Sequence, residues 1–184
     1  MGRRILFTIG HSTRPWREFV GLLKTWGIEQ LIDVRTIPRS RAFPRFSKTH
    51  MTKALPKSGI RYVHLPSLGG LRHARKDSTN TGWQNASFRG FADYMQTAGF
   101  EQGLSQLDER RRKRRVCIMC SEAVWWRCHR RMIADALVAR GIPVRHIMTP
   151  TSAKPHELTP FAVVRRRGRS APIISYPGEK LASA

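Results

Sequence analysis

The residues whose side chains are best suited to chemistry lie in one short stretch of the chain, CSEAVWWRCHR, which begins at Cys120. Glu122 follows it, and Cys128 and His129 stand at the start of a helical pattern. A thiol can attack an electrophile or ligate a metal, and a carboxylate can move protons. Nucleophilic, acid–base or metal-binding chemistry is therefore expected in this stretch.

The three cysteines of the chain are predicted to have different roles. Cys117 and Cys120 form a C-x-x-C string inside an expected strand, where side chains three apart point to opposite faces. Their sulfurs should not meet, so Cys117 is interpreted as a small buried hydrophobe. Cys120 stands where the strand meets the loop, and Cys128 gains positive potential from a helix start and neighbouring arginines, which favours a thiolate.

Several roles stay open for the cluster of Cys120, Cys128 and His129. Zinc is the one cofactor considered, with these residues as ligands, but consecutive residues on a helix project about 100° apart and seldom share a metal. A phosphatase-like loop would need cysteine and arginine six apart, whereas Cys120 and Arg127 are seven apart. A structural or substrate-positioning role, a reactive thiol, a metal site and a regulatory disulfide all remain.

Further candidate residues follow the first two expected strands. His11 and Ser12 come after the first, and Asp33 and Arg35 end the second. Asp33 either moves protons or orients Arg35, whose fork of donors suits a phosphate. His11 is a catalytic group or a satisfied core histidine. Glu122 is either a general base or an internal counter-ion for a nearby arginine.

The elements that must position these residues follow a strand–helix–strand pattern. Apolar runs predict strands at 5–9, 30–35, 61–65, 115–120 and 143–147. Helical spacing predicts helices over about 15–26, 88–95, 100–107 and 129–140, with one short helix within 38–58. We expect a single three-layer α/β domain over 1–149, with a mainly parallel sheet of about five strands and helices on both faces. Residues 150–184 are expected to form a basic Pro/Arg-containing tail that is partly flexible.

In such a sheet, ligands bind at the carboxyl ends of the strands, where loops and helix starts converge. The motifs after the first, second and fourth strands should therefore meet in one site. The apolar content of 40% and the length of 184 residues suit a globular domain with a real core.

The charge balance indicates the class of partner. Thirty-four Lys and Arg against twelve Asp and Glu leave a formal charge of +22, which attracts polyanions. The segment 39–61 interleaves cations such as Arg41 with Phe43 and Phe46, a combination that suits single-stranded or flipped bases. The run RRRKRR at 110–115 precedes the fourth strand and should lie at the opposite edge of the sheet. Nucleic acid or a phosphorylated small molecule is the expected partner.

A cytoplasmic location without a membrane partner is expected. The apolar run after the first basic residues is too short for an export signal, and no apolar stretch approaches the ~20 residues that cross a bilayer. An odd number of cysteines does not suit a disulfide framework.

Five separated motifs resemble those of the domain of unknown function 488 family. They are TIGHS at 8–12, DVR at 33–35, LGG at 68–70, and Cys-x-Glu followed by Cys-His-Arg within 120–130. The resemblance covers roughly residues 4–150 and implies a compact α/β fold, without an assigned activity. Where members of that family often carry a polar turn between the two cysteines, this chain has Val124, Trp125 and Trp126, which argues against a simple solvated phosphate loop.

These features favour an enzyme-like domain that acts on a nucleic acid or nucleotide at the carboxyl ends of the strands. The candidate catalytic residues are Glu122, Cys120, His11 and Asp33. The candidate residues for the substrate and its phosphate are Ser12, Arg35, Cys128, His129, Arg130, Arg41 and Phe43. A nucleic-acid-binding module without catalysis and a metal-stabilised structural domain are the alternatives.

Overall fold

The computed structural model describes residues 5–39, 41–166, 168 and 170–178. Its strands are β1 (Leu6–Gly10), β2 (Gln30–Asp33), β3 (Arg61–His64), β4 (Val116–Cys120), β5 (Val144–Ile147), β6 (Ala153–Pro155), β7 (Val163–Arg165) and β8 (Ile173–Ser175). Its α-helices are α1 (Trp16–Thr25), α2 (Lys48–Ala54), α3 (Ala86–Tyr94), α4 (Ala98–Lys113) and α5 (Arg130–Ala139). Four short 3₁₀ helices are η1 (Pro44–Phe46), η2 (Pro56–Ser58), η3 (Pro66–Leu68) and η4 (Trp125–Arg127). None of the helices over the described residues combines the length and apolar character that crossing a bilayer requires.

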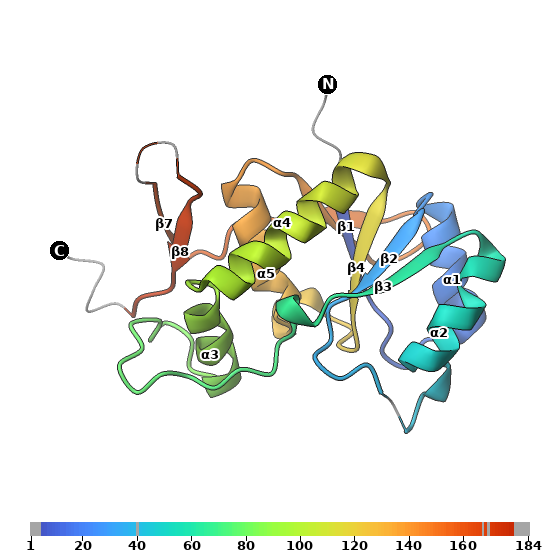
Figure 1. Cartoon of the computed structure of the whole chain (residues 1–184), viewed down its shortest axis with the longest axis horizontal. Helices are drawn as coiled ribbons and strands as arrows, with labels where there is room; N and C mark the ends of the chain where they lie inside the picture. Colours follow the sequence, from blue (N-terminus) through green and yellow to red (C-terminus); the bar gives the residue numbers. More distant parts are fainter. Residues whose placement is uncertain (1–4, 40, 167, 169, 179–184) are drawn as a thin grey trace.

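The main sheet has the strand order β3-β2-β4-β1-β5-β6 (Figure 1). The first five strands pair in parallel, and β6 pairs antiparallel with β5. The predicted α/β fold with a mainly parallel sheet is confirmed. All five strands expected from apolar runs are present, and β6 is a sixth that the sequence pattern did not indicate.

Alternate residues of the central strands belong to two separate hydrophobic cores, one on each face of the sheet. Leu6, Ile32 and Ile118 belong to the core shared with α3, α4 and α5. Phe7 and Cys117 belong to the other core, which α1 and α2 cover. Because successive side chains in a strand face opposite ways, this alternation produces the expected three layers, and it places Cys117 among apolar side chains.

The connections after β1 and β4 diverge to opposite faces of the sheet. The strands themselves are neighbours, with Gly10 opposite Cys120. The chain leaves β1 toward α1 on one face and leaves β4 through η4 toward α5 on the other (Figure 1). A crevice opens where neighbouring strands diverge in this way, at their carboxyl ends.

Backbone contacts continue past the ends of these two strands and hold the crevice together. The N–H of His11 donates to the carbonyl of Cys120, and the N–H of Ser12 donates to the carbonyl of Ser121. A Cβ at Gly10 would lie 1.9 Å from the carbonyl oxygen of Glu122. The motif TIGHS therefore needs glycine at this position for the loop after β4 to approach.

The chain beyond Thr149 contributes to the domain more than its composition indicates. It supplies β6 and the β7–β8 hairpin, and Ile174 and Tyr176 are buried. Asp135 of α5, fully buried, accepts hydrogen bonds from the backbone and hydroxyl of Thr159 and from the hydroxyl of Tyr176. Residues up to 178 therefore complete the polar interior behind α5.

We predict that Tyr176→Phe lowers the free energy of unfolding by about 1–3 kcal/mol, because the buried Asp135 carboxylate loses a donor. Denaturant unfolding measures the change. Ile173→Ala in β8, just before Tyr176, is the control, since Ile173 is 51% exposed and its truncation should cost little. Equal stability of the wild type and Tyr176→Phe would contradict this assignment.

Candidate functional site

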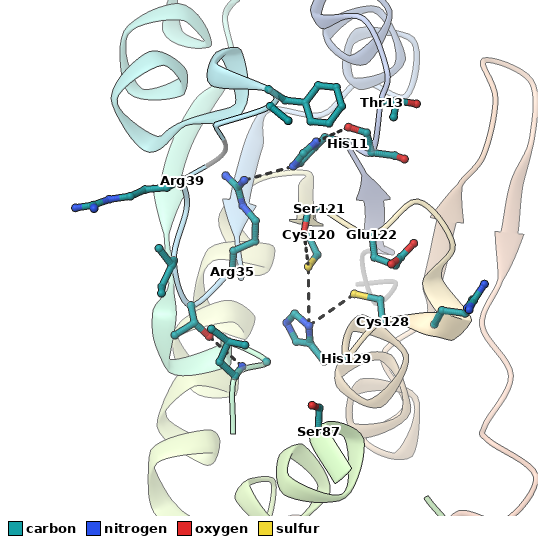
Figure 2. Close-up of a pocket in the computed structure, with 18 of the residues that line it drawn as sticks. His11, Thr13, Arg35, Arg39, Ser87, Cys120, Ser121, Glu122, Cys128 and His129 are labelled. Carbon is teal, nitrogen blue, oxygen red and sulfur yellow. Dashed lines mark hydrogen bonds between the residues drawn. The ribbon is translucent and has the colours of Figure 1, made fainter. Parts of the chain in front are cut away.

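A cavity of about 670 Å³ lies at the carboxyl ends of β1, β2 and β4, within the range typical of ligand pockets (Figure 2). The loops after these strands form most of its wall, with contributions from α3 and from the start of α5. The lining residues are His11, Ser12, Thr13, Arg35, Thr36, Ile37, Arg39, Ala42, Phe43, Gly70, Leu71, Ser87, Phe88, Cys120, Ser121, Glu122, Arg127, Cys128 and His129.

Arg35 lies in the wall of this cavity as a rigidly held cation. Its Nε and Nη2 donate to the two carboxylate oxygens of Asp33 at 2.9 and 2.6 Å, and Nη2 also donates to the carbonyl of Phe46. Asp33 is fully buried, accepts a further hydrogen bond from Tyr62, and is not among the lining residues. Asp33 therefore orients Arg35, one of the two roles considered for it, and leaves Nη1 toward the cavity.

His11 lies beside Nη1 of that guanidinium, which donates a hydrogen bond to its ring. Its Nδ1 donates to the carbonyl of Ser12 at 2.9 Å, and its Nε2 lies 3.4 Å from Arg35 Nη1. The ring stacks on Phe46, with centroids 4.2 Å apart. Burial lowers the pKa of His11 and the charge of Arg35 lowers it further, against the opposing hydrogen bond to Ser12, so Nε2 is an unprotonated acceptor at neutral pH.

Ser12 adopts a left-handed backbone conformation, with φ of 45°. Among the described residues it is the one non-glycine position with positive φ. Such strain persists only where surrounding contacts impose it and is often found at functional sites. Here it turns the chain from β1 so that Ser12 and Thr13 line the cavity.

Across the cavity, two thiols and an imidazole converge (Figure 2). His129 Nε2 donates to the carbonyl of Val34 at 3.1 Å, so in the neutral ring the lone pair of Nδ1 faces the sulfurs. That Nδ1 lies 3.6 Å from Cys128 Sγ and 3.9 Å from Cys120 Sγ. These are the residues in the described chain whose donor atoms could hold a metal ion together.

This convergence differs from the expectation that consecutive Cys128 and His129 project apart. Cys128 is not helical, because its φ and ψ of −135° and 148° are those of extended backbone. His129 has helical angles and directly precedes α5. The change of backbone conformation between the two residues brings both donor atoms to one point.

Arg130 lies directly behind Cys128 and is 1% exposed. It donates to Cys128 Sγ at 3.4 Å, to Thr8 Oγ1 at 3.2 Å and to the carbonyl of Glu122 at 2.6 Å. None of the ion pairs over the described residues pairs Arg130 with a carboxylate. A thiolate at Cys128 is therefore the nearest available counter-charge for this cation.

The pKa values of the two thiols are shifted in opposite directions. Burial raises the pKa of Cys128, but the hydrogen bond from Cys120 and the charge and donors of Arg130 outweigh it and lower the pKa to about 6. The hydrogen bond to Cys128, together with burial, raises the pKa of Cys120 to about 12. These opposite shifts favour a thiolate at Cys128 and a protonated thiol at Cys120.

A buried chain of polar groups continues from Arg130 into the protein. Thr8 Oγ1 lies 2.7 Å from His146 Nδ1, and His146 Nε2 lies 3.0 Å from His156 Nδ1. His156 Nε2 then donates to Asp135 at 2.8 Å. The sequence analysis did not identify these groups, because they come from four separate elements and no local motif links them.

The remaining candidate residues occupy different places. Glu122 is exposed at the cavity rim, where its side chain accepts from the N–H of Ala123, and it forms none of the ion pairs over the described residues. Phe43 lines the cavity at the edge of the His11 ring, whereas Arg41 is exposed and is not among the lining residues. The Glu122 side chain is therefore not the counter-ion of any arginine among the described residues.

Several cavity residues escaped sequence reasoning. Arg39 was included only in a basic segment, Arg127 only as a cation near Cys128 and in the phosphatase spacing that did not fit, and Phe88 only as part of a predicted helix. Gly70 was seen as the start of a loop, yet a Cβ there would lie 2.6 Å from His129 Nδ1. The glycine pair in LGG was the available signal, since such a pair suits a close approach of backbone to another group.

The basic run 110–115 lies away from the cavity. Residues 110–113 end α4, immediately before the amino end of β4 (Figure 1). Arg111 and Arg112 pair with Asp108, and Lys113 pairs with Glu109. The run lies at the edge opposite the site, as expected from the sequence, and its exposed members Arg112 and Lys113 form local pairs within one helix, whereas Arg111 is buried.

We predict that Gly70→Ala lowers the free energy of unfolding by about 1–3 kcal/mol, because the added methyl overlaps the imidazole of His129. Gly21→Ala is the matched control: Gly21 lies in α1 with open space around its Cβ position, so alanine should stabilise by about 0.5–1 kcal/mol. Urea unfolding of both variants measures the effects, and a Gly70→Ala protein as stable as Gly21→Ala would refute the contact.

We predict an acid-sensitive stability that depends on His146. Burial and the neighbouring His156 and Arg130 lower the pKa of His146 to about 2, so the unfolded chain binds a proton below pH 6.5 that the folded protein excludes. Each pH unit below 6.5 should then cost about 1.4 kcal/mol from this group. Unfolding at pH 6.5 and pH 5 should show a shallower decline for His146→Gln, and parallel declines would be inconsistent with a buried neutral His146.

Comparison with known proteins identifies the family of the chain. Residues 15–137 match the family described as Domain of unknown function DUF488. The match includes the DVR, LGG and Cys-His-Arg motifs, and it is narrower than the range of 4–150 inferred from the motifs. No curated protein and no solved structure matches the chain. Because the match covers more than half of the sequence, the chain belongs to the DUF488 family.

Proposed function

We propose that the protein is an enzyme that acts on a nucleic acid or nucleotide bound in the cavity. One observation carries this proposal: Arg35, whose guanidinium is fixed by the Asp33 ion pair, places Nη1 3.4 Å from Nε2 of His11, and both residues line the cavity. A guanidinium held in this way suits a phosphate oxygen, and an adjacent imidazole suits proton transfer at the same group.

The charges of the cavity support an anionic substrate. Three lining residues are arginines, namely Arg35, Arg39 and Arg127, whereas Glu122 is the one acidic residue among the described residues that line it. Glu122 is exposed at the rim. The positive potential therefore exceeds the negative along the wall, which favours phosphate over a cationic ligand.

Two aromatic rings support a base next to that phosphate. Phe43 and Phe88 both line the cavity, from the loop after β2 and from α3. Aromatic rings stack on bases of any sequence, and cations hold the backbone. A single nucleotide unit, either free or turned out of a strand, fits this combination of groups.

A second hollow favours a polynucleotide over a free nucleotide. It is lined by Trp16, Arg45, Ser47, Thr49, His50, Lys53, Ala54 and Lys57. Its three cations belong to the same segment, 39–57, that lines the main cavity. Phosphates that flank the bound nucleotide would lie over these cations.

Affinity measurements test the binding part of the proposal. Fluorescence anisotropy compares a labelled single-stranded oligonucleotide with a labelled mononucleotide. Paired substitutions Arg39→Gln and Arg127→Gln should weaken both ligands about tenfold or more, since each removes a cavity cation. Lys53→Gln with Lys57→Gln should weaken only the oligonucleotide and reduce its salt slope by roughly 0.7 per lost contact.

The matched control removes two cations at the other end of the sheet, Arg112→Gln with Lys113→Gln. Both are exposed at the end of α4, and the affinity for either ligand should stay unchanged. Equal losses in the control and the cavity variants would mean that binding is a property of the total charge rather than of the cavity.

Product formation tests the catalytic part. The protein is incubated with single-stranded DNA, RNA and free nucleotides, and mass spectrometry detects any altered product. His11→Gln should reduce turnover by about 10²-fold or more, because the acceptor beside Arg35 is lost. Tight, salt-dependent binding with no product from the wild type would instead establish a binding module without catalysis.

A further inference from the structure

We propose that Cys120, Cys128 and His129 form a site for a thiophilic divalent metal ion of the Zn²⁺ type, with three protein ligands and a fourth position open to the cavity. Their donor atoms all lie within 4.8 Å of one another. Two sulfurs and an imidazole nitrogen are ligands that zinc prefers, and three protein ligands with an open fourth position characterise reactive zinc centres. The site is independent of which substrate the cavity accepts.

The spacing of the donor atoms matches a tetrahedral ion. Ligand distances of about 2.3 Å to sulfur and about 2.0–2.1 Å to nitrogen place sulfur and nitrogen roughly 3.6 Å apart at a tetrahedral angle. The observed separations from His129 Nδ1 are 3.6 Å to Cys128 Sγ and 3.9 Å to Cys120 Sγ. A shift of a few tenths of an ångström by Cys120 would bring its sulfur to the same distance from His129 Nδ1.

The imidazole of His129 is held in the orientation that a ligand needs. Its Nε2 donates to the carbonyl of Val34, and the edge of its ring packs against Phe91. The backbone of Gly70 also lies close to the imidazole of His129, because glycine has no side chain to separate the two. Metal-binding histidines almost always donate the second ring N–H to a carbonyl or carboxylate, which fixes the tautomer.

The surroundings of Cys128 favour a thiolate ligand. Arg130 donates to Cys128 Sγ, and such hydrogen bonds to coordinated sulfur are a usual outer shell. Two thiolates and a divalent ion are together neutral, so the buried Arg130 then adds a single positive charge to the cluster. All three ligands are buried, yet all three line the cavity, which places the fourth position there.

The chain offers a control at the third cysteine. Cys117 lies on the same strand as Cys120, is fully buried and packs in the core on the face of α1 and α2. It is absent from the group of convergent donor atoms. Metal binding by thiols in general would weaken when Cys117 is substituted, whereas binding at the proposed site would not change.

Metal titration of the reduced full-length protein tests the proposal. Metal-free protein is titrated with Zn²⁺ in competition with a chromophoric chelator, and with Co²⁺ to detect thiolate-to-cobalt charge-transfer and tetrahedral d–d absorption. We expect one ion per chain. Cys120→Ser, Cys128→Ser and His129→Gln should each weaken binding by at least tenfold, and Cys117→Ser should bind as the wild type does.

A second measurement on the wild type does not depend on variants that fold. Alkylation with iodoacetamide, followed by peptide mass spectrometry, reports the labelling of each cysteine. Zn²⁺ should slow the labelling of Cys120 and Cys128 and leave the rate at Cys117 unaltered. Labelling rates that Zn²⁺ does not change would overturn the proposal. A Cys120–Cys128 disulfide that persists in reducing buffer and prevents Zn²⁺ binding would overturn it as well.

These outcomes separate the metal site from the proposed function. Arg39→Gln with Arg127→Gln should weaken nucleotide binding and leave the Zn²⁺ affinity unchanged, because neither arginine is a ligand. A protein that binds Zn²⁺ but no nucleotide refutes the proposed function alone. A protein that binds and converts nucleotides without any Zn²⁺ affinity refutes the metal site alone.

Discussion

The buried guanidinium of Arg130 joins strand β1, the loop after β4 and the Cys128 thiol. It contacts the Cys128 sulfur on one side, the carbonyl of Glu122 in the loop after β4, and Thr8 of β1 on the other. A cation without a carboxylate partner is costly in a protein interior unless its donors are satisfied and a counter-charge lies near. The acidity of Cys128 follows from this requirement, since its thiolate provides that charge.

The segment after β6 also contributes to this polar interior. Behind Thr8, the polar chain of His146 and His156 leads from Arg130 to the buried Asp135. His156 comes from the segment after β6, and its ring and that of His146 pack against Trp125. Trp125 lies in the apolar stretch between the two cysteines, so this insert supports the buried polar chain rather than a solvated loop.

The two walls of the cavity are therefore built by different means. On one wall, Asp33 holds Arg35 in place, and the ring of His11 accepts a hydrogen bond from it. On the other, backbone geometry brings Cys128 and His129 to one point with Cys120. The divergence of the connections after β1 and β4 separates the walls, because the chain leaves these neighbouring strands toward opposite faces.

The sequence by itself determined the five parallel strands, the layers of helices and the gathering of motifs at the carboxyl ends. Apolar runs and helical spacing are local signals, and parallel strands leave few ways to arrange them. Strand parity likewise assigned Cys117 to the core. Only the tertiary structure decided that Asp33 faces Arg35, that Gly70 adjoins His129, and that His146 and His156 lie behind the site. Apart from the Asp33–Arg35 pair, these contacts join residues far apart in the chain, and the energies of all of them depend on burial and distance, which no local pattern encodes.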